Sequence, residues 1–320
     1  MGAYAIRRLL WIPVTIILIS MIVFLLVRFI PGNVVDLILA EMQPTASDAV
    51  IDRAVIEHAL GLDLPIPVQY AKWVGNIVLH GSLGKSLNGN RDIATEIFGR
   101  LPVTMELGLM GLLIGVIIAI PIGVYAAIRQ DSIPDYILRS GAILLISIPG
   151  FWIGTMIMIY PSIWWGWSPP MELIHFTKDP LGNLGMFLLP ALVIGTSMTG
   201  ATMRMTRTMM LEVLRQDYIR TAWSKGLTEK TVVIRHALKN ALIPVITIVG
   251  MQLPMIIGGT VIIENIFVLP GIGRLLLEAL TQRDYPIVSG INLVFATFVV
   301  VINLFVDLTY GWLDPRIHYQ

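Results

Sequence analysis

Residues that could carry chemistry are few in this chain, and none of them forms a catalytic or metal-binding pattern. None of the histidines belongs to a His-Glu-x-x-His motif or a close pair, and the chain has no cysteine, so we expect no metal site. The five are His58, His80, His175, His236 and His318. An intramembrane enzyme is an alternative, but it would need a Ser/His or paired-Asp arrangement at membrane depth, and the long apolar runs contain neither. We therefore expect no catalytic residue.

The segment Gly84-Lys85-Ser86 has the three residues that end a phosphate-binding loop. Such a loop requires four residues between its two glycines, whereas only two separate Gly81 from Gly84. The segment is therefore predicted to be a turn rather than a nucleotide site.

The composition indicates which elements must position any site. Charged residues make up 13% of the 320 residues, about half the share of an average soluble domain. The mean hydropathy is +0.78. Too few charges remain to cover a soluble surface, and disorder requires low hydrophobicity. The chain is predicted to be an all-α integral membrane protein. A channel is a further alternative, for which no filter-like segment is evident.

Six uncharged runs are long enough to cross a hydrocarbon core of about 30 Å at 1.5 Å per helical residue. They predict a first span within residues 1–30 and five more at about 104–128, 138–160, 183–204, 241–263 and 286–308. Pro161 predicts that the third helix ends near Tyr160. Gly111 and Gly115 predict a face of the second span on which another helix packs closely.

The distribution of charge predicts the topology. If both termini are cytoplasmic (N-in, C-in), the inner segments hold 13 basic and 7 acidic residues and the outer segments hold 9 and 14. The resulting net charges, +6 and −5, add to the +1 of the whole chain and agree with the positive-inside rule. Residues 31–100 are then an extracytoplasmic insertion after the first helix. Residues 101–320 form the core, with a basic cytoplasmic loop at 205–240.

This loop is predicted to be a helix, a glycine break and a second helix. Leu211, Leu214, Tyr218 and Ala222 recur at helical spacing. Gly226 can end that helix in the left-handed conformation. Thr228 can then cap the next helix, which runs toward the fifth span. Two interpretations are open: a basic amphipathic segment on anionic lipid, or a short helix with an exposed aromatic face that docks in the groove of a partner.

The sequence of this loop resembles the EAA loop of ABC importer permeases, and more narrowly the B-type permease subunit of dipeptide/oligopeptide transporters. Ala222, Gly226 and Leu238 match the general pattern, while Arg220 and His236 replace its usual residues, as they do in the peptide branch. Other segments also resemble the family: Arg7-Arg8-Leu9-Leu10, Leu60-Gly61-Leu62-Asp63, Gly81-Ser82-Leu83-Gly84-Lys85-Ser86, Glu264-Asn265-Ile266-Phe267, Pro270-Gly271-Ile272-Gly273-Arg274-Leu275 and Leu313-Asp314-Pro315-Arg316-Ile317.

The resemblance implies a type I ABC importer permease fold in a bacterial or archaeal cell membrane. It implies a subunit that translocates di- or oligopeptides delivered by an extracytoplasmic binding protein, in a heterodimer with a second permease and with two cytosolic ATPases. ATP and Mg²⁺ would be bound by the ATPases, no cofactor by this chain, and the remaining contacts would be with lipid, not nucleic acid. The residues implied to contact an ATPase are Tyr218, Ile219, Arg220, Thr221, Ala222, Trp223, Ser224, Lys225, Gly226 and Leu227. Nickel or another small solute remains an alternative substrate.

Two further groups of residues are candidates for the transport route. Gln252, Asn292 and Asn303 are polar residues inside predicted spans, so they either line the route or form hydrogen bonds between helices. A turn-rich segment and an amphipathic stretch at 274–280 follow the fifth span and are predicted to form an outer gate. The gate candidates are Glu264, Pro270, Gly271, Gly273 and Arg274. Glu106 and Asp307 lie near predicted span ends, where interfacial solvation is expected.

Overall fold

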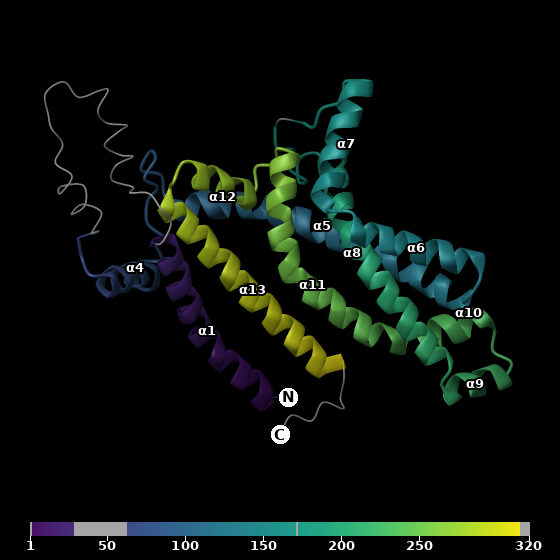
Figure 1. The fold of residues 1–320 in the computed structure, drawn as a ribbon. Helices are drawn as coiled ribbons and strands as arrows, with labels where there is room; N and C mark the ends of the chain where they lie inside the picture. Colours follow the sequence, from purple (N-terminus) through teal and green to yellow (C-terminus); the bar gives the residue numbers. More distant parts are fainter. Residues whose placement is uncertain (1, 29–62, 171, 314–320) are drawn as a thin grey trace, which may run out of the picture. The chain divides into compact units, whose positions relative to one another are not determined.

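The computed structural model describes residues 2–28, 63–170 and 172–313, and the regular elements of these residues are helices joined by short loops (Figure 1). Within these ranges there is no β-strand, only an isolated antiparallel bridge between Lys85 and Asp92. This confirms the all-α prediction. The first half of the expected insertion, up to Leu62, and the C-terminal motif beyond Leu313 lie outside the described residues.

Five helices of the described chain are long and apolar enough to cross a membrane, and a sixth span results if one bent helix pair is counted. Those with a single label are α1 (Gly2–Arg28), α5 (Ile93–Ile128), α8 (Pro180–Leu214) and α13 (Tyr285–Leu313). The other is the helical run Glu229–Ile266, which consists of α10 (Glu229–Thr231), a π-helix (Val232–Leu238) and α11 (Lys239–Ile266).

The predicted third span is the bent pair. The sequence predicts one helix over 138–160, whereas the structure has α6 (Ile133–Ser147) and α7 (Gly150–Trp165) at 90° to each other. Pro149 separates them, because the residue before a proline is held out of the helical region, as the extended Ile148 shows. The predicted end at Tyr160 is wrong: Pro161 lies inside α7, which ends at the left-handed Gly166 (φ 62°).

Two other spans are longer than their apolar cores. α5 begins eleven residues before the predicted 104, because Asp92 caps it by accepting from the backbone N and the Oγ1 of Thr95 (2.9 and 2.8 Å). α8 begins at Pro180 after the cap Asp179 and extends to Leu214, into the stretch predicted as a loop. A search for uncharged runs misses such extensions, since the polar turns of a helix lie outside the apolar window.

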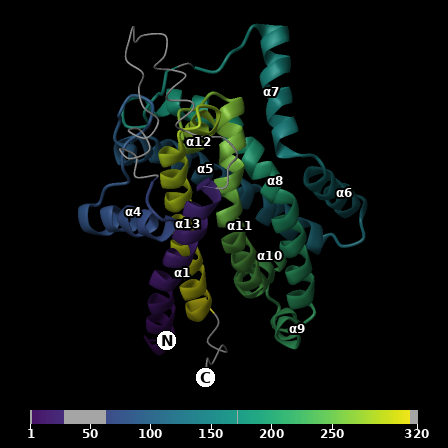
Figure 2. The same cartoon turned by 60° about the vertical axis from the view of Figure 1, so that its left-hand side comes forward.

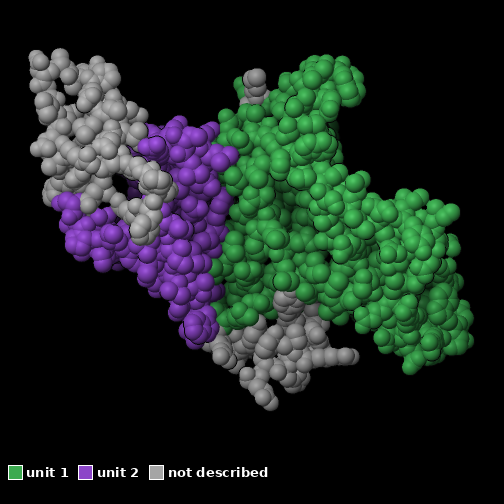
Figure 3. All heavy atoms as spheres, in the orientation of Figure 1, with its two compact units in different colours: residues 1–9, 100–274, 298–320 green, residues 10–99, 275–297 purple. Residues whose placement is uncertain are grey.

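The chain divides into two compact units, which are described separately (Figure 3). Unit 1 comprises residues 1–9, 100–274 and 298–320. In it, α5 packs against α8 through the predicted small face: a Cβ on Gly115 would lie 3.0 Å from the carbonyl oxygen of Gly195, and one on Gly111 2.7 Å from Ile194. Leu107 and Phe187 are fully buried in the same core. Only glycine allows the two helices to approach so closely.

Unit 2 comprises residues 10–99 and 275–297. The helix α4 (Ile66–His80) packs on α1, where the Ser20 and Tyr70 hydroxyls form a hydrogen bond of 2.8 Å. The ring of Phe24 packs against those of Tyr70 and Trp73. The start of α5 contacts α13 in the same unit: Gly290 lies so near Ile93 that a Cβ on the glycine would be 2.9 Å from the isoleucine side chain.

Candidate functional site

The cytoplasmic loop of the sequence prediction forms a helix, a glycine break and a second helix, as expected. α9 (Asp217–Ser224) lies at the end of α8, and both views show it beyond the end of the α11 helix (Figures 1 and 2). Gly226 is left-handed (φ 74°), a conformation that glycine adopts without steric cost. One detail of the prediction is wrong: the regular spacing from Leu211 to Ala222 spans a break at residues 215–216. No proline or glycine marks that break.

α9 has one buried face and one exposed face. Ile219 is fully buried and Ala222 nearly so, both in an apolar cluster with the end of α8. The buried residues of this cluster are Ala127, Met210, Ile219, Ala222, Val232, Val233, Ala237 and Ala241. The cluster therefore joins α9 to the ends of α5 and α8 and to the start of the α10–α11 run. We refer to it as the α9 cluster.

The other face of α9 presents aromatic and polar side chains. Tyr218 is 43% exposed and Trp223 is 45% exposed, in agreement with the expected aromatic face. The Tyr218 hydroxyl accepts a hydrogen bond from Asn240 Nδ2 (2.8 Å), which fixes its ring against the start of α11. Arg220 and Asp217 form an ion pair of 3.5 Å, but both are so exposed that it contributes little. The exposed face is thus available for contact, while the buried face holds the helix in place.

The helix after Gly226 contains a feature that no sequence signal indicates. Thr228 occupies the N-cap position, as predicted, although its hydroxyl bonds to that of Thr231 and not to a backbone N–H. The backbone then winds as a π-helix from Val232 to Leu238. Val232 and Ala237 are both fully buried, five residues apart. The wider π turn brings residues i and i+5 to one face, and such turns are frequent at functional sites.

The predicted outer-gate residues lie together in one hydrogen-bonded turn. The Glu264 carboxylate is fully buried and accepts from the Thr104 hydroxyl (2.7 Å) and from the Arg274 backbone N (3.1 Å). Thr104 in turn accepts from the Ile272 backbone N (2.9 Å). Thr104 was not predicted, because it is 160 residues away in the sequence.

The glycines of this turn are explained by the same carboxylate. A Cβ on Gly271 would collide with the carboxylate of Glu264, and one on Gly273 would lie 2.9 Å from its Oε2 and closer still to Val261. Pro270 precedes them. The guanidinium of Arg274 donates to the carbonyl of Val268 (3.1 Å), so it also closes the turn. α12 (Ile272–Thr281) follows and includes the predicted amphipathic stretch 274–280.

The three candidates for the transport route have different surroundings. Gln252 donates from Nε2 to the Thr202 hydroxyl (3.2 Å), a contact between α11 and α8 that fits the alternative of helix–helix hydrogen bonding. Asn292 is half-buried on α13 in unit 2, and Asn303 is exposed on α13 in unit 1. Of the two carboxylates near span ends, Asp307 pairs with Arg8 (3.1 Å) and Glu106 is half-buried in α5.

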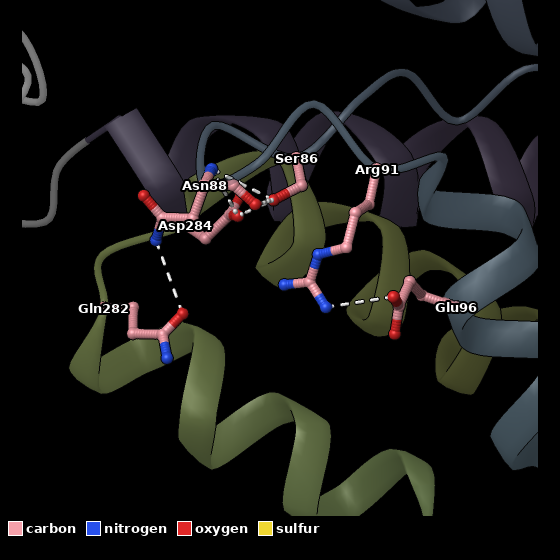
Figure 4. Close-up of polar contacts among 6 residues, drawn as sticks. All are labelled: Ser86, Asn88, Arg91, Glu96, Gln282 and Asp284. Atoms are coloured by element: carbon pink, nitrogen blue, oxygen red, sulfur yellow. Dashed lines mark hydrogen bonds and ion pairs between the residues drawn. The ribbon is translucent and has the colours of Figure 1, made fainter.

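The segment Gly84-Lys85-Ser86 lies in a loop but is not itself the turn: it pairs with Arg91–Ile93, and the turn follows it at residues 87–89. The loop is held by a residue that sequence reasoning missed (Figure 4). Buried Asp284 accepts from the Ser86 hydroxyl and from the backbone N of Leu87 (3.3 Å) and of Asn88 (3.4 Å). It also accepts from Ile287 N at the start of α13 (3.4 Å). This loop is not suited to binding phosphate, because its hydroxyl and backbone N–H donors already bind the carboxylate of Asp284. Across the described ranges, no group of three or more His, Asp or Glu side chains is placed to hold a metal ion.

Comparison with known proteins gives full-length matches. A family model described as a binding-protein-dependent transport system inner membrane component matches residues 119–319, and the model of its N-terminal part matches residues 1–108. A putative peptide transport system permease protein of Brucella suis is 41% identical, covering 97% of this chain and 96% of its own length. An oligopeptide transport system permease protein of Bacillus subtilis is 38% identical over the whole of both chains. A dipeptide transport system permease protein of Escherichia coli is 37% identical, with 99% of each chain covered.

A solved structure of an amino acid ABC transporter shares the fold. It is 12% identical, with a TM-score of 0.52, and covers 68% of this chain and 94% of its own. This likeness concerns the fold alone and agrees with the helical architecture expected from the sequence.

Proposed function

This chain belongs to the family of inner membrane components of binding-protein-dependent transport systems, and we propose that it is the permease subunit through which an ATP-driven importer moves peptides. It is a multi-pass protein of the cell membrane. The peptide substrate follows from relatives in three organisms that are named as peptide, oligopeptide or dipeptide permeases. Di- and oligopeptides are both within this proposal.

α9 is the proposed contact with an ATPase, and its two faces carry this proposal. Ile219 and Ala222 hold the helix in the α9 cluster, while Tyr218 and Trp223 remain exposed beside basic residues. The face that includes Arg220 and Thr221 would lie in a groove of the ATPase, with residues 224–227 forming the turn beside it. The ATPase, not this chain, would bind ATP and Mg²⁺.

A rigid connection between α9 and the spans supports a role in transmission. The α9 cluster contains residues from the ends of α5 and α8 and from the start of the α10–α11 run. Since packed cores transmit displacement rather than absorb it, movement of α9 during ATPase closure would displace these helices together. The transport route would thereby change from inward-facing to outward-facing.

The remaining assignments complete the importer. With N-in/C-in topology, α9 faces the cytoplasmic ATPases, while residues 31–100 and the Glu264–Arg274 turn face the binding protein. A second, homologous permease would complete a heterodimer. The buried Glu264 favours the turn as a fixed frame of the outer gate. Gln252, Asn292 and Asn303 are retained as candidates for the wall of the transport route.

Reconstitution tests this function. The chain is co-expressed with its second permease and two ATPases, placed in lipid vesicles, and supplied with the binding protein and labelled di- and oligopeptides. We expect peptide accumulation that requires ATP and the binding protein. Accumulation of nickel or another small solute with none of peptide would refute the peptide assignment. Failure of ATPases to co-purify with the chain would refute the subunit assignment as well.

A further inference from the structure

An ion pair buried between α6 and α8 has no role in the function proposed above. Asp135, in the first turn of α6, is fully buried, and its two carboxylate oxygens accept from Nε and Nη2 of Arg207 on α8 (2.7 and 2.6 Å). The backbone N of Asp131 donates to the same carboxylate (3.0 Å), so the loop before α6 is held as well. A bidentate pair of this kind fixes angle as well as distance.

The stability of the α6–α8 contact does not require this pair. Buried Ala142 on α6 and Met203 on α8 belong to one apolar cluster, and Gly200 allows α8 to approach the carbonyl of Ala142 closely. Desolvation offsets most of the attraction within a buried ion pair, so such a pair is weak evidence for stability. What it supplies here is a fixed orientation of the first turn of α6 relative to α8.

The position of Arg207 connects this pair to α9. Met210, three residues later on the same helix, is fully buried in the α9 cluster against Ile219. Thr206, the residue before Arg207, contacts Gly123 of α5. The α9 cluster contains residues of α5, α8, α9 and the α10–α11 run, and among the described residues none from α6. A displacement of α9 therefore reaches α6 through α8, where Arg207 holds Asp135, and through α5, whose Ala126 shares an apolar cluster with Ala142 of α6.

We propose that the Asp135–Arg207 ion pair transmits the displacement of α9 to the bent span formed by α6 and α7, an inference that rests on the proposed function. When the ATPases move α9 and with it the end of α8, the bidentate pair makes the first turn of α6 follow. α6 ends at the 90° bend before α7, and α7 contacts α11 where Gly154 lies beside Ile263 and Phe267. Asp135 and Arg207 are thus positioning residues that act on the orientation of the bent span.

The test separates transmission from stability. The double variant Asp135→Leu with Arg207→Met replaces the pair by apolar side chains, which commonly preserves folding. In reconstituted full complexes, we measure peptide taken up per ATP hydrolysed and the stimulation of hydrolysis by the loaded binding protein. We expect normal assembly and a ratio about tenfold lower than in the wild type, within the usual range of coupling between two sites. A ratio equal to the wild-type ratio would overturn the inference.

Two further variants keep the test decisive. Arg207→Lys retains the charge but loses the bidentate fork, so we expect assembly as in the wild type and less peptide taken up per ATP hydrolysed. If the double variant fails to assemble, a wild-type ratio of uptake to hydrolysis in Arg207→Lys overturns the inference. Arg91→Gln with Glu96→Gln removes a partly exposed pair of 3.0 Å outside the α6–α8 contact and is the matched control, for which no change is expected. A wild-type complex that takes up no peptide would refute the proposed function instead.

Discussion

The buried carboxylate of Glu264 gives the most direct test of the energetics of this protein. Glu264→Ala removes the acceptor of two hydrogen bonds, from the Thr104 hydroxyl (2.7 Å) and the Arg274 backbone N (3.1 Å). Each donor left without a partner costs about 1–3 kcal/mol, so we expect the free energy of unfolding to fall by about 2–6 kcal/mol. The cavity left by the shorter side chain would add to this loss. Glu264→Gln retains one carbonyl oxygen and the side-chain volume and should lose less.

The measurement is thermal unfolding of the chain in lipid nanodiscs, followed by tryptophan fluorescence. We expect the order wild type, Glu264→Gln, Glu264→Ala in falling melting temperature. Glu172→Ala is the matched control, since this glutamate is exposed in a loop. Gly271→Ala should resemble Glu264→Ala, because its Cβ collides with the same carboxylate. If Glu264→Ala melts at the temperature of Glu172→Ala, the view that this carboxylate holds the turn is refuted.

Three further predictions concern α9 and the start of α5. Ile219→Asp places a charge in the α9 cluster and should abolish co-purification of the ATPases, whereas Thr221→Asp leaves the buried face of α9 intact and should keep the chain folded, as judged by its melting temperature. Gly226→Ala forces a non-glycine residue to φ 74°, at a cost of about 1–2 kcal/mol, and should lower peptide-coupled ATP hydrolysis; Gly99→Ala, in a helix with open space around it, should not. The hydrogen bonds from Thr95 lower the pKa of Asp92, so the stabilisation of the start of α5 by Asp92 is present above the ordinary carboxyl range and is lost as pH falls through the lowered pKa. Hydrogen exchange at residues 93–96 should therefore accelerate at low pH in the wild type. In Asp92→Ala it should be independent of pH after correction for intrinsic exchange.

The elements that the sequence predicted best are those with a strong local signal. Gly226 and Thr228 mark the break and the restart of the cytoplasmic helices, because left-handed glycine and N-capping are local properties of the chain. The small face of α5 at Gly111 and Gly115 was predicted for the same reason. The bend at Pro149 was missed, since an apolar run of sufficient length says nothing about its direction.

The candidate site was likewise predicted only where its signal is local in the sequence. Tyr218 and Trp223 are exposed, as the docking interpretation expects, but helical spacing placed Tyr218 on one face with Ala222, which is buried. The break at 215–216 and the π-helix over Val232–Leu238 follow from packing in the α9 cluster, which joins segments more than 100 residues apart. Thr104 could not be assigned to the Glu264 turn for the same reason.

The acidic residues show most clearly what composition leaves out. Charges in a membrane protein are first interpreted as markers of topology, yet three acidic residues in the described part of the chain are fully buried: Asp135, Glu264 and Asp284. Each accepts a backbone N–H close to the start of a helix: Asp284 from Ile287 in α13, Glu264, which lies near the end of α11, from Arg274 in α12, and Asp135 from Asp131 in the loop before α6. The first turn of a helix has backbone donors without partners and a positive dipole end, and an apolar surrounding offers no water to satisfy them. A buried carboxylate meets both requirements, so these three residues hold the loops that lead into α6, α12 and α13. The low charge content of the chain makes each of them individually more consequential, since few other side chains could replace it.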